Sequence, residues 1–237
     1  MNSLETLEDN TTLNLSKILD HMIRNKECEY VSEILKNNTS IKELDCRSIG
    51  IQTEDCKKIS EGLKNNAYLQ HLNLQNNHIG DEGCKYLSDA LKNNTSLRIL
   101  DLWDNNIGDE GCKYLSEVLK NNTSLQKLDL GFNNIGNEGY KYLFEALKNN
   151  TSLYDLNISN NNNHKIGTKE LNEIDKITKD NRENHFHDKE NLLLLLSCRT
   201  LQEESVLSIQ NLPLDMFKEI LNEAMIPFVV SKKRKTE

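Results

Sequence analysis

The chain has 237 residues, 36% of them hydrophobic, and a formal net charge of −8. This negative charge argues against nonspecific binding to nucleic acid or to an anionic membrane. The first ten residues are polar and acidic, unlike a signal peptide, and no apolar run approaches the roughly 20 residues that span a bilayer. We therefore expect an intracellular, cytoplasmic protein without nucleic-acid or membrane partners.

Residues 1–38 are expected to form an N-terminal cap with a degenerate repeat. The apolar residues between Leu13 and Arg24 recur on one helical face, so a helix is predicted there rather than a strand. The segment from Glu27 to Asn38 matches the second half of the units that follow, which predicts a further helix. A stack of repeated units needs such a terminal segment to cover its open core.

Residues 39–181 consist of a repeated unit of 28 residues, with an irregular first copy at 39–66. Further copies begin at Ala67, Thr95, Thr123 and Thr151. A fixed period of this length is typical of a solenoid, in which each unit contacts only its neighbours. The last copy carries three extra residues, and the repeats are expected to end near Asn181.

One copy contains the pattern Leu97-x-x-Leu100-x-Leu102-x-x-Asn105-x-Ile107. This pattern resembles that of the leucine-rich repeat family. The unit length and the second half, GDEGCKYLSEVLK, resemble the ribonuclease-inhibitor subtype over roughly residues 11–181. The resemblance implies that the Asn105 side chain bonds backbone groups of neighbouring turns.

The periodicity within the unit predicts one strand and one helix. Leu100 and Leu102 alternate with polar residues on a strand, whereas Cys112, Leu115 and Leu119 share one helical face. Strands lie about 4.8 Å apart and packed helices roughly 8–10 Å apart, so stacking both layers curves the stack. The expected fold class is an α/β leucine-rich-repeat solenoid with a curved parallel sheet inside, helices outside and a helical C-terminal tail.

Two turns connect the strand and the helix. Gly108 is expected to permit the sharp bend that follows the strand, because glycine adopts conformations closed to other residues. Asn121 and Asn122 are expected to end the helix in the left-handed conformation.

Four cysteines occupy a single position of the repeated helix, because they are spaced 28 residues apart: Cys28, Cys56, Cys84 and Cys112. A small buried residue facing the strands is favoured over a metal or disulfide ladder, since stacked cysteine usually behaves as a small hydrophobe. Cysteine use of this kind fits a reducing compartment.

Residues 182–237 are expected to form a charged linker, 182–190, followed by the helical tail. His185 and His187 could hold a metal ion on one side of an extended linker, but a solvated segment is favoured. The segment at Leu212-Pro213 weakly resembles the opening of an F-box or a SOCS box, although too few residues follow for a full F-box.

The chain ends in a basic cluster that resembles a nuclear-import signal: Lys232, Lys233, Arg234 and Lys235. A tail that only adds solubility is the alternative.

Strand residues other than the core leucines are expected on the concave face, where they form the candidate binding site. The predicted partner-binding residues are Arg98, Asp101, Trp103, Asp104, Lys127, Asp129, Phe132, Tyr154 and Asp155. Exposed aromatics grouped with charges favour a protein interface. The alternative is that Trp103 packs onto its neighbours or under the tail.

A row of carboxylates, Asp45, Asp101 and Asp129, lies at one strand position, where Asn73 interrupts it. Neighbours about 4.8 Å apart could raise one another's pKa. A face for a basic partner is favoured over catalysis, because no histidine or cysteine stands beside the row in a nucleophile–base arrangement.

The sequence therefore predicts a monomeric, non-catalytic protein-binding module with no cofactor, no metal and no catalytic residues. Two alternatives stay open. The resemblance of the segment at Leu212-Pro213 to an F-box or a SOCS box implies a ubiquitin-ligase substrate adaptor. The solenoid subtype also resembles the Ran GTPase-activating protein, which implies a GTPase activator, although no catalytic residue carries over.

Overall fold

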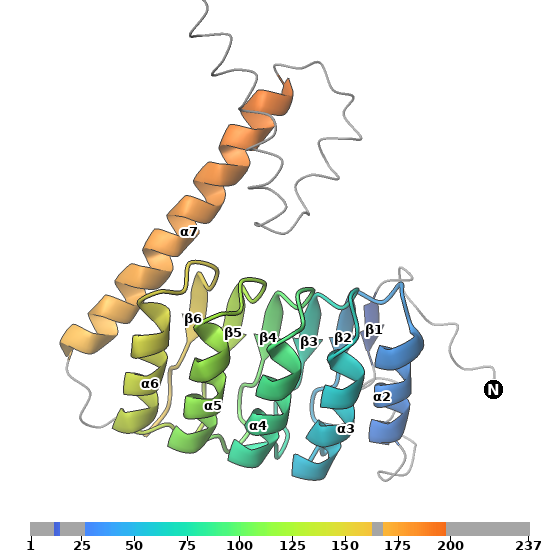
Figure 1. The fold of residues 1–237 in the computed structure, drawn as a ribbon. Coiled ribbons are helices and arrows are strands. Elements are labelled where there is room, and N and C mark those ends of the chain that lie inside the picture. Colours follow the sequence, from blue (N-terminus) through green and yellow to red (C-terminus); the bar gives the residue numbers. More distant parts are fainter. Residues whose placement is uncertain (1–11, 15–26, 163–167, 198–237) are drawn as a thin grey trace, which may run out of the picture. The chain divides into compact units, whose positions relative to one another are not determined.

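The computed structural model describes residues 12–14, 27–162 and 168–197 (Figure 1). The chain divides into two compact units, Met1–Lys179 and Asp180–Glu237. In chain order the elements are β1 (Thr12–Asn14), α2 (Glu27–Asn37), β2 (Glu43–Asp45), α3 (Thr53–Leu63), β3 (His71–Asn73), α4 (Gly80–Leu91), β4 (Ile99–Asp101), α5 (Asp109–Leu119), β5 (Lys127–Asp129), α6 (Asn137–Leu147), β6 (Asp155–Asn157) and α7 (Thr168–Ser197).

The strands form one parallel sheet in the order β1-β2-β3-β4-β5-β6. Neighbouring strands pair with the same register throughout, so Leu44, Leu72, Leu100 and Leu128 lie side by side. Helices α2 to α6 lie next to one another as a second layer along the sheet (Figure 1). The expected α/β solenoid is confirmed.

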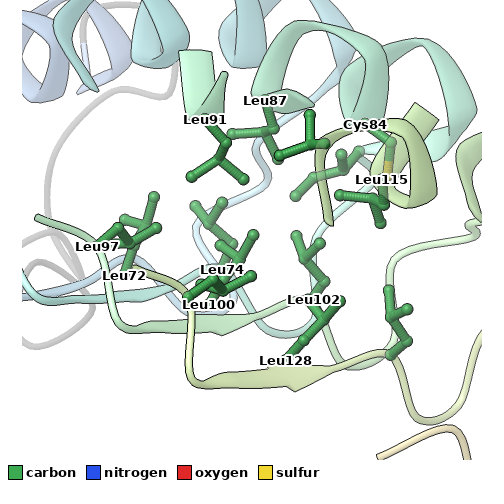
Figure 2. Close-up of a cluster of buried hydrophobic side chains, with 14 of the residues drawn as sticks. Leu72, Leu74, Cys84, Leu87, Leu91, Leu97, Leu100, Leu102, Leu115 and Leu128 are labelled. Atoms are coloured by element: carbon green, nitrogen blue, oxygen red, sulfur yellow. The ribbon is translucent and has the colours of Figure 1, made fainter. Parts of the chain in front are cut away.

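The core lies between the two layers. Figure 2 shows Leu87 and Leu91 of α4 directed toward the strand leucines, among them Leu72 and Leu100. These side chains are almost completely buried. Since a fully buried leucine stabilises a fold by about 1.5–3 kcal/mol, the leucine rows account for much of the driving force.

One ladder of buried asparagines ties each turn after a strand to its neighbours. The Nδ2 of Asn105 donates to the carbonyl oxygen of Leu74 in the preceding repeat at 2.9 Å. The Oδ1 of Asn133 accepts from the backbone N–H groups of Asn105 at 2.9 Å and Ile107 at 3.0 Å. The implied role of Asn105 is confirmed, and these bonds satisfy backbone groups that would otherwise be buried without partners.

A second ladder joins the helix ends and corrects the prediction for Asn121 and Asn122. Neither residue has a positive φ. Instead, the Nδ2 of Asn122 donates to the carbonyl of Leu91 at 3.0 Å, and its Oδ1 accepts from the N–H of Leu125 at 2.8 Å. A left-handed residue is unnecessary here, because the asparagine side chain bonds the helix-end carbonyl of the preceding repeat.

The helix predicted from Leu13 is wrong at its start. Leu13 belongs to β1, pairs in register with Leu44 of β2 and is 2% exposed. The open edge of β2 offers backbone partners to this segment, and the apolar periodicity alone did not reveal them. The rest of that predicted helix, residues 15–26, lies outside the described residues. The helix predicted from Glu27 is confirmed as α2.

The linker predicted at 182–190 is also wrong, because α7 continues through it from Thr168 to Ser197. This segment contains no glycine or proline, and its charged residues are compatible with a solvated helix. Within the ranges that the structure describes, no helix is both long and apolar enough to cross a membrane. The segment at Leu212-Pro213 and the basic cluster at 232–235 lie outside these ranges.

Candidate functional site

The sheet has one face toward the helices and one that we term the open face. The open face carries three rows of side chains, one residue from each repeat in each row. The first row is Glu43, His71, Ile99, Lys127 and Asp155. The second row is Asp45, Asn73, Asp101, Asp129 and Asn157. The third row follows two residues later: Arg47, Gln75, Trp103, Gly131 and Ser159.

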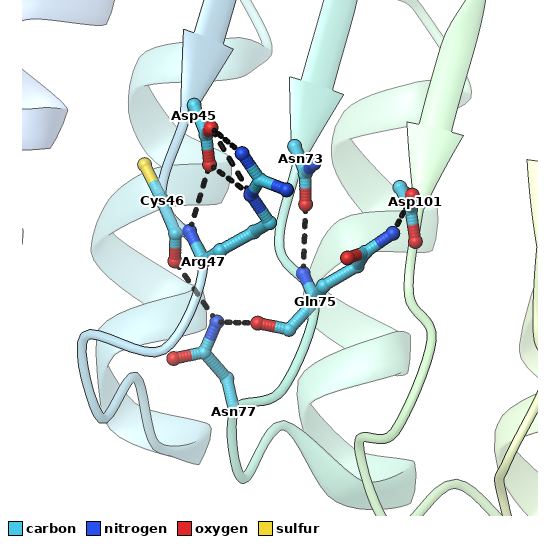
Figure 3. Close-up of polar contacts among 7 residues, drawn as sticks. All are labelled: Asp45, Cys46, Arg47, Asn73, Gln75, Asn77 and Asp101. Carbon is cyan, nitrogen blue, oxygen red and sulfur yellow. Dashed lines mark hydrogen bonds and ion pairs between the residues drawn. The ribbon is translucent and has the colours of Figure 1, made fainter. Parts of the chain in front are cut away.

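The second row has a structural role in every repeat. A side-chain oxygen of Asp101 accepts the backbone N–H of Trp103 at 3.1 Å, and one of Asp129 accepts that of Gly131 at 2.8 Å. Figure 3 shows the same bond at Asp45 and at Asn73. Asparagine and aspartate both supply the acceptor that this turn needs, so the row alternates between them without changing the backbone.

At each end of the open face, one carboxylate is paired with a cation of the chain itself. Arg47 donates from Nε and Nη2 to both oxygens of Asp45, with the shortest bond 2.7 Å (Figure 3). The Nζ of Lys127 lies 3.4 Å from an oxygen of Asp155 and 5.9 Å from the ring centroid of Tyr154.

The two central carboxylates are held by amides instead. The Nε2 of Gln75 donates to Asp101, and the Nδ2 of Asn157 donates to both oxygens of Asp129 at 3.0 Å. In the described part of the chain, neither carboxylate forms an ion pair. Burial raises the pKa of Asp101, the hydrogen bonds from Trp103 and Gln75 partly oppose this rise, and the nearby charge of Asp129 adds a smaller one. Burial is therefore the main cause of the raised pKa of Asp101, and the neighbouring carboxylate makes only a minor contribution to it.

Trp103 and Phe132 meet on the open face beside these carboxylates. Their ring centroids are 5.0 Å apart with an interplanar angle of 36°. Gly131 provides the space, because a Cβ there would lie 2.9 Å from Cδ1 of Trp103 and 3.2 Å from Oδ1 of Asp129. Trp103 is thus half-buried against its neighbours, as the alternative reading held, while Phe132 remains 52% exposed.

Phe132 occupies a position with left-handed backbone in every repeat. Its φ is 58°, close to the values at Ser48, Asn76, Asp104 and Asn160. Short polar residues tolerate this conformation, whereas a bulky side chain costs roughly 1–2 kcal/mol. Asp104 is one of the predicted site residues, and its short polar side chain suits the left-handed backbone of this turn. The recurrence of Asn, Asp and Ser at this position of the repeat was a sequence signal for the left-handed backbone.

The remaining predicted site residues stand at the strand entrances. Arg98 and Tyr154 are half-buried, and each donates its backbone N–H to the preceding repeat, to Gln70 at 2.8 Å and to Gln126 at 2.9 Å. Tyr154 contacts Lys127. The sequence did not reveal that Gln75 and Asn157 bond the central carboxylates. It also did not reveal that Gly131 leaves the space in which the indole of Trp103 packs.

The cysteine position is confirmed as a small buried residue. Cys56, Cys84 and Cys112 are free and buried, and Cys46 in the sheet is as well. Burial raises the pKa of the Cys84 thiol, which keeps it protonated. The side chain of Cys28 lies outside the described set.

The histidine pair of the predicted linker is separated by the helix. His185 is 2% exposed, while His187 is exposed. Residues two apart on a helix do not face each other, so the pair does not meet as it would on an extended segment. The prediction of a solvated segment was therefore wrong at His185, whose side chain is buried. Among described residues, no group of three or more His, Cys, Asp or Glu side chains is arranged to hold a metal ion.

Comparisons with known proteins agree with this architecture. Residues 84–185 match the family model described as the TMOD/LMOD leucine-rich domain, and residues 65–88 match that of a leucine-rich repeat. No curated protein sequence matches the chain. With its repeats, sheet and asparagine ladder, the chain is a leucine-rich repeat protein.

Two solved structures share the fold. The structure titled "Leiomodin-1 Actin-Binding Site 2 (ABS2)" is similar with a TM-score of 0.59 and 23% identity, covering 73% of this chain and 96% of its own. The tropomodulin C-terminal domain of Caenorhabditis elegans is similar with a TM-score of 0.59 and 19% identity, covering 67% of this chain and 95% of its own.

Proposed function

We propose that the chain is a non-catalytic protein-binding module that acts as a monomer through its open face. The repeats, residues 39–181, carry this function. We expect the open face to be the concave one, because strands lie closer together than packed helices do. The observation that supports it is the half-exposed Trp103–Phe132 pair beside Asp101 and Asp129. Aromatic anchors ringed by polar groups are typical of interface hot spots.

Actin is the first partner to test, because one structurally similar domain is named as an actin-binding site of leiomodin-1. The full chain would be assayed with filamentous actin by co-sedimentation and with monomeric actin by fluorescence anisotropy. We expect saturable binding to at least one form. No binding to either form would exclude actin as the partner.

The contribution of the open face is tested with two substitutions that occur naturally in neighbouring repeats. Trp103→Gln introduces the residue that stands at position 75, and Phe132→Asn introduces the one at position 160. We expect each to weaken partner binding by about tenfold or more, as for a hot-spot residue. Lys113→Gln on the exposed side of α5 is the control and should leave affinity unchanged. If all three variants bound equally well, the open face would not be the binding surface.

A further inference from the structure

The central repeats of the open face lack the cation that the first repeat carries. Arg47 stands two residues after Asp45 and neutralises it, and the equivalent position after Asp101 is Trp103. After Asp129 the equivalent residue is Gly131. The two central carboxylates are therefore adjacent in register and hydrogen-bonded only to amides, whereas Asp45 and Asp155 at the ends of the face are each paired with a cation.

The chain already contains an example of the arrangement that would complete this site. The Nζ of Lys127 lies near both the carboxylate of Asp155 and the ring of Tyr154. A cation held by a carboxylate and an aromatic face gains from both an ion pair and a cation–π contact. At the centre of the open face, the carboxylates and the aromatic rings are present, and no cation of the described residues forms an ion pair there, although Arg47 and His71 lie near enough to act on Asp101 electrostatically.

The position of Phe132 points to a role outside folding. Its left-handed backbone is filled by a short polar residue in the other described repeats, and its ring is 52% exposed. A bulky residue in this conformation is unfavourable, so the exposed ring is retained against a cost in stability.

We propose that Trp103, Phe132, Asp101 and Asp129 form a receptor for an arginine side chain, presented by an extended basic segment of a partner protein. This inference rests on the proposed function. Arginine suits the site better than lysine, because its planar guanidinium stacks on aromatic rings while its N–H groups bond carboxylates. The chain's net charge of −8 also favours a basic partner over an acidic one.

The test uses the full chain and two blocked heptapeptides of glycine and serine, one with two arginines and one with citrulline in their place. Citrulline keeps the shape but has no charge. Trp103 is the only tryptophan, so its fluorescence reports on this site directly. At about 20 mM salt, where surface charges are weakly screened, we expect the arginine peptide to change the emission saturably. Its affinity should exceed that of the citrulline peptide by about tenfold or more.

Two double variants separate a receptor from general electrostatic attraction. Asp101→Asn with Asp129→Asn removes two charges and keeps the acceptors for the turns, as Asn73 does. This variant should lose the preference for arginine over citrulline. Asp45→Asn with Asp155→Asn removes the same charge from carboxylates that are already paired, and the preference should persist. Equal binding of the two peptides to the wild-type chain, or equal loss in both double variants, would overturn the proposal.

The two proposals fail in distinguishable ways. If Trp103→Gln abolished binding to actin while the wild-type chain did not discriminate between the peptides, the open face would bind protein without an arginine receptor. If the peptides were discriminated but actin was not bound, the receptor would stand and its natural partner would be a different basic protein.

Discussion

The carboxylate of Asp81 in α4 accepts the backbone N–H of Gly108, 2.6 Å away in the next repeat. The same oxygen accepts the N–H of Gly111 at 3.0 Å. Asp109 repeats the arrangement with Gly136 at 2.7 Å and Gly139 at 2.9 Å. An acidic residue at one helix start thus caps the helix of the following repeat, which couples the units beyond their apolar contacts.

Removal of this inter-repeat cap should destabilise the solenoid. We expect Asp109→Ala to lower the free energy of unfolding by about 1–2 kcal/mol, because two N–H groups at the start of α6 lose a charged acceptor. Urea denaturation followed by circular dichroism measures the change. Glu110→Ala, at the exposed neighbouring position, is the control and should change stability by less than about 0.5 kcal/mol. Equal effects of the two substitutions would contradict the capping role.

The glycine in the first turn of α5 should not tolerate a side chain. A Cβ on Gly111 would lie 2.6 Å from Cγ2 of Ile107 and 2.7 Å from Oδ1 of Asp81. We expect Gly111→Ala to destabilise by about 1–3 kcal/mol through overpacking, although alanine has the higher helix propensity. The matched control is Glu117→Ala on the exposed side of the same helix, which should be close to neutral. A more stable Gly111→Ala variant in thermal unfolding would refute the steric argument.

The second asparagine ladder can be tested with adjacent residues. Asn122→Ala should cost about 2–4 kcal/mol, because buried carbonyl and N–H groups of two repeats lose their partners. Asn121 is exposed, so Asn121→Ala should cost less than about 1 kcal/mol. Chemical denaturation of both variants gives the comparison, and similar midpoints would show that the ladder contributes little.

Phe132→Asn should increase stability while it weakens binding. Asparagine adopts the left-handed conformation more readily, so we expect a gain of about 1 kcal/mol in thermal or urea unfolding. Phe144→Asn provides the contrast, because Phe144 packs against the core from α6 and its loss should destabilise the fold. If Phe132→Asn were also destabilising, the exposed ring would have a structural role that its backbone conformation does not indicate.

Asp101→Asn should have a pH-dependent effect on stability. The pKa of Asp101 is raised above 3.8, its ordinary value, so the folded chain binds its proton more tightly than the unfolded chain. The wild type therefore loses stability as pH rises from about 3.8 through the raised pKa. We expect the variant to be more stable at pH 7, by less than about 1 kcal/mol, with the gain disappearing near pH 3.5. A variant that was less stable at pH 7 would show that the carboxylate is favourable in the fold.

The repeat allowed most of the fold to be predicted, because burial in a solenoid follows directly from sequence position. The strand leucines and the helix face at Cys112 follow from the 28-residue period, and the ladder role of Asn105 was implied by the resemblance to the leucine-rich repeat family. The strand at Leu13 could not be predicted in this way, since it depends on a sheet edge supplied by β2. Gly108 was expected to provide a bend, yet its φ is −107° and its neighbour Asp81 limits the space instead.

The candidate site was predictable as a set of positions but not as a set of contacts. The period placed Trp103 and Phe132 on the same face, and the structure brings their rings together. The period gave no indication that the indole of Trp103 packs over Gly131. It also did not indicate that Asp45 and Asp155 form ion pairs while Asp101 and Asp129 do not. Those differences depend on side-chain reach between neighbouring strands, and sequence spacing does not describe it.

The second asparagine ladder also determines how the chain would respond to the secretory pathway. Asn94, Asn122 and Asn150 each begin an Asn-x-Ser sequence that N-glycosylation enzymes recognise, yet in the folded chain their amide nitrogens donate to buried carbonyl groups. At these three positions a glycan could be attached only before the repeats close, and each attached sugar would then exclude its asparagine from the ladder. At these three positions glycosylation and folding therefore compete for the same nitrogen, whereas the exposed Asn93, Asn121 and Asn149 begin Asn-Asn-Thr sequences that could be glycosylated without that competition.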